Sequence, residues 1–97
     1  MKINIQTIDF NPRQDLLDLV DEKVGKLGRF SDRIIECKVL LRVEKSDKRD
    51  NKITELRAVI PGNDIFVKKQ YESFEEGILK ATEALERQIK EWKEKNS

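Results

Sequence analysis

The stretch KVGKLGRFSDRIIECKVLLRVEK, residues 23–45, decides the fold because it carries the chain from an amphipathic helix into a strand. Val24, Leu27 and Phe30 continue an apolar stripe at helical spacing. From Ile34 to Lys45, apolar side chains alternate with mostly polar ones, which is the period of a strand with one covered face. The residues expected on that covered face are Ile35, Cys37, Val39, Leu41 and Val43.

Upstream, a strand and a helix start precede this stretch. Two isoleucines alternate with polar neighbours over residues 2–8, as in a half-buried strand. Asn11 then stands as a helix N-cap before Pro12, which suits the first helical position because proline has no backbone N–H to satisfy. The helix that begins there should end near Gly28.

Downstream, three further elements follow. Residues 46–52 are typical of a charged hairpin loop, and apolar residues then alternate along a third strand over 54–60. The Pro-Gly pair at 61–62 predicts a type II turn, in which the glycine supplies the positive φ. A fourth strand follows at 65–71. Ser73 then opens a capping box, and an apolar stripe at helical spacing runs almost to the end of the chain.

The resulting order, β-α-β-β-β-α, predicts the α+β class. Two helices can lie on one face of a four-stranded, mostly antiparallel sheet, which gives a two-layer sandwich. The 97 residues are expected to form one domain, residues 1–97, with no internal repeat or linker. A chain of this size buries only about 60–65% of its extended surface, so the core must be small and single.

The sequence offers little for catalysis. It contains no histidine, which removes the usual base near neutral pH and the commonest transition-metal ligand. The single cysteine, Cys37, is expected to be a small buried side chain, and there is no glycine-rich phosphate loop. The acids of the first helix are typical of a solvated face. We therefore expect no enzyme activity, cofactor, metal site or small-molecule ligand.

The overall charge and hydropathy set two further limits. The formal net charge is only +1, so an electrostatic binding surface must come from the distribution of charge rather than its total. No stretch approaches the ~18 consecutive apolar residues of a membrane span, and the first ten residues lack the apolar region of a signal peptide. We expect a cytoplasmic protein with no membrane partner.

Basic side chains are unevenly distributed along the chain. Lys23 and Lys26 flank one side of the first helix's apolar stripe, and Lys23 must lay its aliphatic stem along that stripe. Arg29 and Arg33 follow on either side of Phe30. If these cations converge, they form a surface suited to phosphate groups, where charge density provides the affinity. The candidate RNA-binding residues are Lys23, Lys26, Arg29, Arg33, Lys68, Lys69, Lys80, Arg87 and Lys90.

Other observations restrict this surface. Lys68 and Lys69 are neighbours on one strand and point to opposite sheet faces, so at least one lies outside any common patch. On the second helix, four glutamates each precede a basic residue by four positions, so intrahelical pairing and solvation also explain its charge. These pairs are Glu76–Lys80, Glu83–Arg87, Glu86–Lys90 and Glu91–Lys95.

The aromatic residues mostly fall at core positions. A platform on which single-stranded bases stack is therefore not expected, and structured RNA recognised by its shape is the better fit. The residues concerned are Phe30, Phe66, Tyr71, Phe74 and Trp92.

Several motifs together resemble one known family. KVGKLGRFSDRI at 23–34 resembles the run of lysine, lysine-leucine, aromatic and Asp-Arg-Ile in the short ribosome hibernation-promoting factors, the ribosome-associated inhibitor proteins of bacteria. The similarity continues through VLLRVEK at 39–45, ESFEEGI at 72–78 and LERQIKEWKEK at 85–95. No single motif is specific, but their order and spacing cover nearly the whole chain.

The resemblance implies a function without catalysis. Such proteins bind the small ribosomal subunit through its rRNA, occupy the channel for mRNA and tRNA during stationary phase, stop translation and preserve idle ribosomes. It implies rRNA contacts at Lys23, Lys26, Arg33 and Arg87, and it leaves open a second hibernation factor as a partner. Ala84 and Glu91 stand where the family is expected to carry lysines, which reduces the contribution expected from the second helix.

Two alternatives remain at this stage. The first is a general structured-RNA-binding domain of the double-stranded-RNA type, which typically carries basic residues at the start of its last helix. Residues 71–77, YESFEEG, are acidic there and argue against it. The second is a protein-interaction domain that does not bind RNA and whose charged surface only keeps it in solution.

Overall fold

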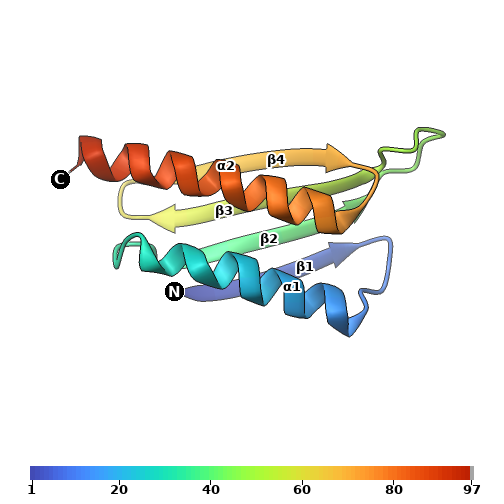
Figure 1. The fold of residues 1–97 in the computed structure, drawn as a ribbon, viewed down its shortest axis with the longest axis horizontal. Coiled ribbons are helices and arrows are strands. Elements are labelled where there is room, and N and C mark those ends of the chain that lie inside the picture. The colour runs from blue at the N-terminus through green and yellow to red at the C-terminus, as the bar shows by residue number, and fades with distance from the viewer. Residues whose placement is uncertain (97) are drawn as a thin grey trace.

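The computed structural model describes residues 1–96 and shows the chain as two layers, a sheet and a pair of helices (Figure 1). The strands are β1 (Lys2–Ile8), β2 (Glu36–Val43), β3 (Lys52–Ile60) and β4 (Asn63–Tyr71). The helices are α1 (Gln14–Gly25), the short 3-10 helix η1 (Lys26–Arg29) and α2 (Phe74–Lys95). The α+β fold with β-α-β-β-β-α order is therefore confirmed.

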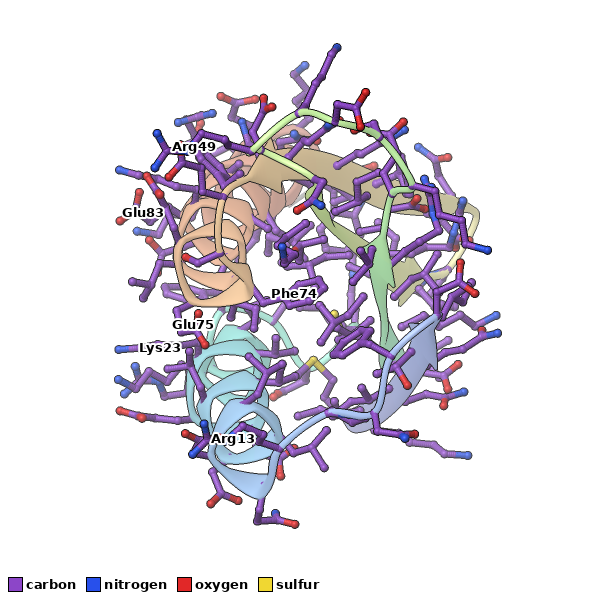
Figure 2. All side chains as sticks on the ribbon, turned by 90° about the vertical axis from the view of Figure 1, so that its right-hand side faces the viewer. Arg13, Lys23, Arg49, Phe74, Glu75 and Glu83 are labelled. Atoms are coloured by element: carbon purple, nitrogen blue, oxygen red, sulfur yellow. The ribbon has the colours of Figure 1, made fainter. Side chains whose placement is uncertain are left out.

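The strands form one sheet in the order β1-β2-β3-β4. β1 is parallel to β2, because α1 and η1 return the chain to the end of the sheet where β1 begins. The β2–β3 and β3–β4 pairs are antiparallel hairpins. Both helices cover the same face of the sheet, and the opposite face, which we call the open face, has no helix over it (Figure 2).

The core lies between the helices and the covered face. α2 packs over β3 and β4, while α1 lies beside α2 and next to β1. Strand positions such as Cys37 and Leu56 are fully buried against helix positions such as Val20 and Ile78. The rings of Phe10 and Phe74 stack with their centroids 4.6 Å apart, joining the segment after β1 to the start of α2.

Two local sequence signals act as predicted. The Ser73 side chain accepts a hydrogen bond from the backbone N–H of Glu76 at 3.2 Å, which satisfies an N–H group left free at the start of α2. Gly62 has φ of 85°, the left-handed conformation that a type II turn needs. These residues fix where α2 begins and where β3 turns into β4.

The expected start of the first helix is wrong by two residues. α1 begins at Gln14, and its N-cap is Arg13 rather than Asn11. Arg13 has extended backbone angles, and Asp9 has a positive φ of 68°, so residues 9–13 form a bend instead of a helical turn. This bend places Phe10 against Phe74, and that packing outweighs the local helix-start signal.

The face expected for Ile35 is also wrong. Ile35 is 60% exposed, whereas Ile34 is buried in the core. The regular strand begins only at Glu36, so the strict alternation of faces does not extend back to residues 34–35. The Ile35 backbone nevertheless forms hydrogen bonds to both adjacent strands. Its N–H donates to the carbonyl of Val59 in β3, and its carbonyl accepts from the N–H of Lys2 in β1.

Candidate nucleic-acid interface

Three of the predicted cations meet at one hollow in the helix layer. Lys23 comes from the last turn of α1, and Lys26 and Arg29 come from η1. They line a hollow of about 120 Å³ whose other wall is Thr82, Glu83 and Glu86 of α2. The Lys23 side chain is only 30% exposed, so its stem packs along the protein as predicted while its ammonium reaches the edge.

α2 contributes three more cations around the same hollow. Lys80 pairs with Glu83 at 4.0 Å, and Lys90 pairs with Glu86 at 3.9 Å. Arg87 is exposed and lies one turn after Glu83 on the same side of the helix. We call the six residues the helix-layer cluster, and they are Lys23, Lys26, Arg29, Lys80, Arg87 and Lys90.

The helix-layer cluster carries an excess of positive charge. Its cations outnumber the carboxylates beside them, and the recorded ion pairs are long and exposed to solvent, where such pairs are weak. Lys23 and Glu83 extend from the helices to the outside, away from the sheet (Figure 2). A polyanion approaching the helices would therefore meet cations that are not tightly neutralised.

Arg33 and Lys90 lie against aromatic rings. The guanidinium carbon of Arg33 is 4.3 Å from the centroid of the Trp92 ring, and the Nζ atom of Lys90 is 4.9 Å from that of Phe30. The segment after η1 and the end of α2 thus each supply one cation and one ring, an arrangement we call the cation–π clasp. Arg33 Nη1 also donates to the carbonyl of Asn96 at 3.2 Å, which partly commits this residue to the fold.

Lys68 and Lys69 do not join the helix-layer cluster. Lys69 lies half-buried on the covered face, where Thr54 is its partner across the β3–β4 pair. Lys68 is exposed and belongs to the open face. The prediction that the two point to opposite faces is confirmed, and neither lines the hollow.

Intrahelical pairing in α2 is sparser than the spacing allows. Within the described residues, only one of the four expected pairs is recorded, between Glu86 and Lys90. Lys80 pairs with Glu83 three residues later instead of with Glu76. Arg87, which could pair with Glu83, is left available for a partner outside the chain.

The described part of the chain holds no arrangement suited to metal or thiol chemistry. Among residues 1–96, no three or more acidic, cysteine or histidine side chains lie close enough together to hold a metal ion. Burial raises the pKa of Cys37 from 9.0 to about 12, with the nearby Glu36 carboxylate adding to the effect. This thiol stays protonated at neutral pH and is a poor nucleophile.

Among these same residues, no helix is long and apolar enough to cross a membrane.

The expectation that the aromatic residues are core residues fails at one position. Phe74 is buried, but Phe66 is 42% exposed on the open face. Phe66 alternates along β4 with Ile65 and Val67, whose side chains occupy the covered face. An aromatic residue at a wet position of an alternating strand is the sequence signal that could have identified it.

Comparison with known proteins assigns the family. Residues 3–97 match the family described as Sigma 54 modulation protein / S30EA ribosomal protein. This chain belongs to the S30EA ribosomal protein family. A curated relative from Pseudomonas putida, named ribosome hibernation promoting factor, is 30% identical over 95 residues, covering 98% of this chain and 89% of the relative.

Two solved structures share the fold. The N-terminal domain of Protein Y from Thermus thermophilus superposes with a TM-score of 0.80 at 22% identity, covering 95% of this chain and 99% of that one. A ribosomal subunit interface protein from Coxiella burnetii gives a TM-score of 0.80 at 19% identity, covering 96% of this chain and 98% of that one. As an S30EA member, the chain is a ribosome-associated binding and regulatory protein rather than an enzyme.

Proposed function

We propose that this protein is a ribosome hibernation factor that occupies the mRNA and tRNA channel of the small ribosomal subunit. It would act in the cytoplasm during stationary phase, stopping translation and preserving inactive ribosomes. The observation that carries the proposal is the meeting of Lys23, Lys26 and Arg29 at one solvent-exposed hollow beside α2. The family and the name of the Pseudomonas putida relative support the ribosome as the partner.

The chemistry of the helix-layer cluster favours phosphate groups over base edges. Lysine and arginine ends arranged along an exposed surface provide charge density, which holds an RNA backbone without reading its sequence. Folded ribosomal RNA presents many phosphates on a surface of fixed shape, and a rigid pair of helices can match that shape. Arg87 and Lys90 extend the surface along α2, and Arg33 borders it through the clasp.

The proposal is tested by cosedimentation of the protein with vacant bacterial ribosomes and with separated subunits. Binding to the small subunit that excess mRNA and tRNA displace is the expected result, because all three would compete for one channel. Binding to the large subunit alone, or binding unaffected by mRNA and tRNA, would contradict the assignment to the channel.

The residues are tested by charge reversal. Lys23→Glu combined with Lys26→Glu should weaken ribosome binding by at least ~10-fold, because both phosphate contacts become repulsive. The thermal midpoint should change little, since neither ammonium is buried. The matched control is Lys45→Glu with Lys48→Glu in the exposed β2–β3 loop, which reverses the same number of charges far from the hollow. An equal loss of ribosome binding in both double variants would show that binding depends only on the overall charge of the protein and not on Lys23 and Lys26.

A further inference from the structure

The open face of the sheet carries a second polar surface on the side opposite the helix-layer cluster. The strand register aligns Asn4, Lys38, Arg57 and Phe66 in one row across all four strands. The next row is Gln6, Leu40, Glu55 and Lys68. These two rows border a hollow of about 190 Å³ to which every residue except Lys68 contributes.

The first row contains an unfavourable pair of charges. Lys38 and Arg57 are direct partners across the antiparallel β2–β3 pair, where like charges oppose each other and destabilise the sheet. Lys38 makes no recorded hydrogen bond or ion pair within residues 1–96. Such a local conflict between sequence and fold is expected at a functional site, where an anion would relieve it.

Arg57 and Phe66 form a surface on which a base can stack. The guanidinium carbon of Arg57 lies 4.9 Å from the centroid of the Phe66 ring, and its Nη1 atom is 3.6 Å from the Asp64 carboxylate. Phe66 remains 42% exposed despite this contact. An exposed ring on an uncovered sheet, flanked by cations, is the arrangement with which sheet proteins stack unpaired bases.

The rest of the hollow is polar in a way that suits a nucleotide. The amides of Asn4 and Gln6 offer both donors and acceptors, and Glu55 can accept from a base amino group. The apolar residues that line it besides Phe66 are Leu40 and Val39, and Val39 is buried in the core, so the surface is a poor match for the apolar core of a protein interface.

We propose that the open face binds an unpaired nucleotide of single-stranded RNA, with the base on Phe66 and a phosphate beside Lys38 and Arg57. This inference rests on the proposed ribosome-binding function and extends it: the protein would contact RNA on both layers, folded rRNA with its helices and a single strand with its sheet. Lys68 then belongs to the sheet surface, in the row next to Phe66.

The test is fluorescence anisotropy of the full chain with a fluorescein-labelled seven-nucleotide single-stranded RNA of mixed sequence. Phe66→Leu keeps apolar bulk and removes the ring, so it should weaken binding roughly 10-fold, the scale of one lost stacking contact. Lys38→Gln should also weaken binding. Lys48→Gln, which removes one equally exposed charge in the β2–β3 loop, should leave it unchanged. Circular dichroism melts would verify that each variant is folded.

Comparison with the helix-layer variant separates this inference from the proposed function. Lys23→Glu with Lys26→Glu should leave oligonucleotide binding within about twofold while reducing ribosome cosedimentation. Oligonucleotide binding lost in that variant and kept in Phe66→Leu would overturn the inference. The inference would also be overturned if the unaltered protein binds ribosomes but does not bind the oligonucleotide. In that case, loss of ribosome binding in Phe66→Leu would mark the open face as a protein-docking surface. Oligonucleotide binding without ribosome binding would instead contradict the proposed function alone.

Discussion

Gly77 is a position where a single hydrogen in place of a side chain decides how closely a helix approaches the sheet. A Cβ atom added there would lie 2.6 Å from Oγ1 and 3.4 Å from Cβ of Thr54. Thr54 is fully buried and β-branched, so it has little freedom to move away. Gly77→Ala should therefore lower the free energy of unfolding by ~1–3 kcal/mol in urea titration, although alanine is the better helix former by about 1 kcal/mol.

Thr54→Ala provides the control for this prediction. The Thr54 hydroxyl is buried without a hydrogen-bond partner among the described residues, so its removal takes away both the clash and an unsatisfied polar group. In the Thr54→Ala background, Gly77→Ala should be nearly neutral or stabilising. A double-mutant cycle with additive effects would show that the two residues do not interact and that the close approach is relieved elsewhere.

At the scale of elements, periodic sequence patterns predicted the fold well. The strand at residues 2–8 and the Ser73 cap of α2 agree with the structure because they depend on neighbours close in the chain. The start of α1 was missed because Phe10 packs on Phe74, 64 positions away in the sequence. Ile35 was misplaced because a strand pattern does not reveal where regular pairing begins.

The candidate site was less predictable than the fold because it depends on contacts between residues that are distant in the sequence. The sequence indicates that Lys23 and Lys26 share one side of a helix, but not that Glu83 and Glu86 of α2 form the opposite wall. The exposure of Phe66 depends on both helices packing on the other face. Contacts between elements therefore determine which of the basic residues act together.

The cation–π clasp should couple the segment after η1 to the end of α2. Arg33→Gln removes the charge but keeps a polar chain, and it should lower the free energy of unfolding by ~0.5–1 kcal/mol, the scale of an exposed cation–π contact. In a Trp92→Leu background the same change should have a smaller effect, because the ring is already gone and only the hydrogen bond from Arg33 to the Asn96 carbonyl remains to be lost. Urea titration of the four proteins measures the coupling, and equal effects of Arg33→Gln in both backgrounds would show that Arg33 and Trp92 are merely adjacent.

For the whole molecule, a net charge of +1 conceals a separation of charge. The outward side of α1 is acidic at residues 15, 18, 21 and 22, whereas its last turn and η1 carry Lys23, Lys26 and Arg29. One molecule therefore presents repelling and attracting surfaces to the same polyanion. This polarity would orient the protein on RNA, a role that a uniformly basic domain could not perform.

The number of cations engaged on the ribosome should appear in the salt dependence of binding. If Lys23, Lys26, Arg29 and Arg87 each neutralise one phosphate, the logarithm of the binding constant should fall with the logarithm of the salt concentration with a slope of about −2.8 to −3.6. Lys26→Gln should reduce the magnitude of that slope by about one, whereas Lys48→Gln in the β2–β3 loop should leave it unchanged. Cosedimentation across a series of potassium chloride concentrations gives the slopes. A nearly flat dependence for the unaltered chain would mean that binding does not depend on phosphate contacts, and the helix-layer cluster would then have no role in holding the ribosome.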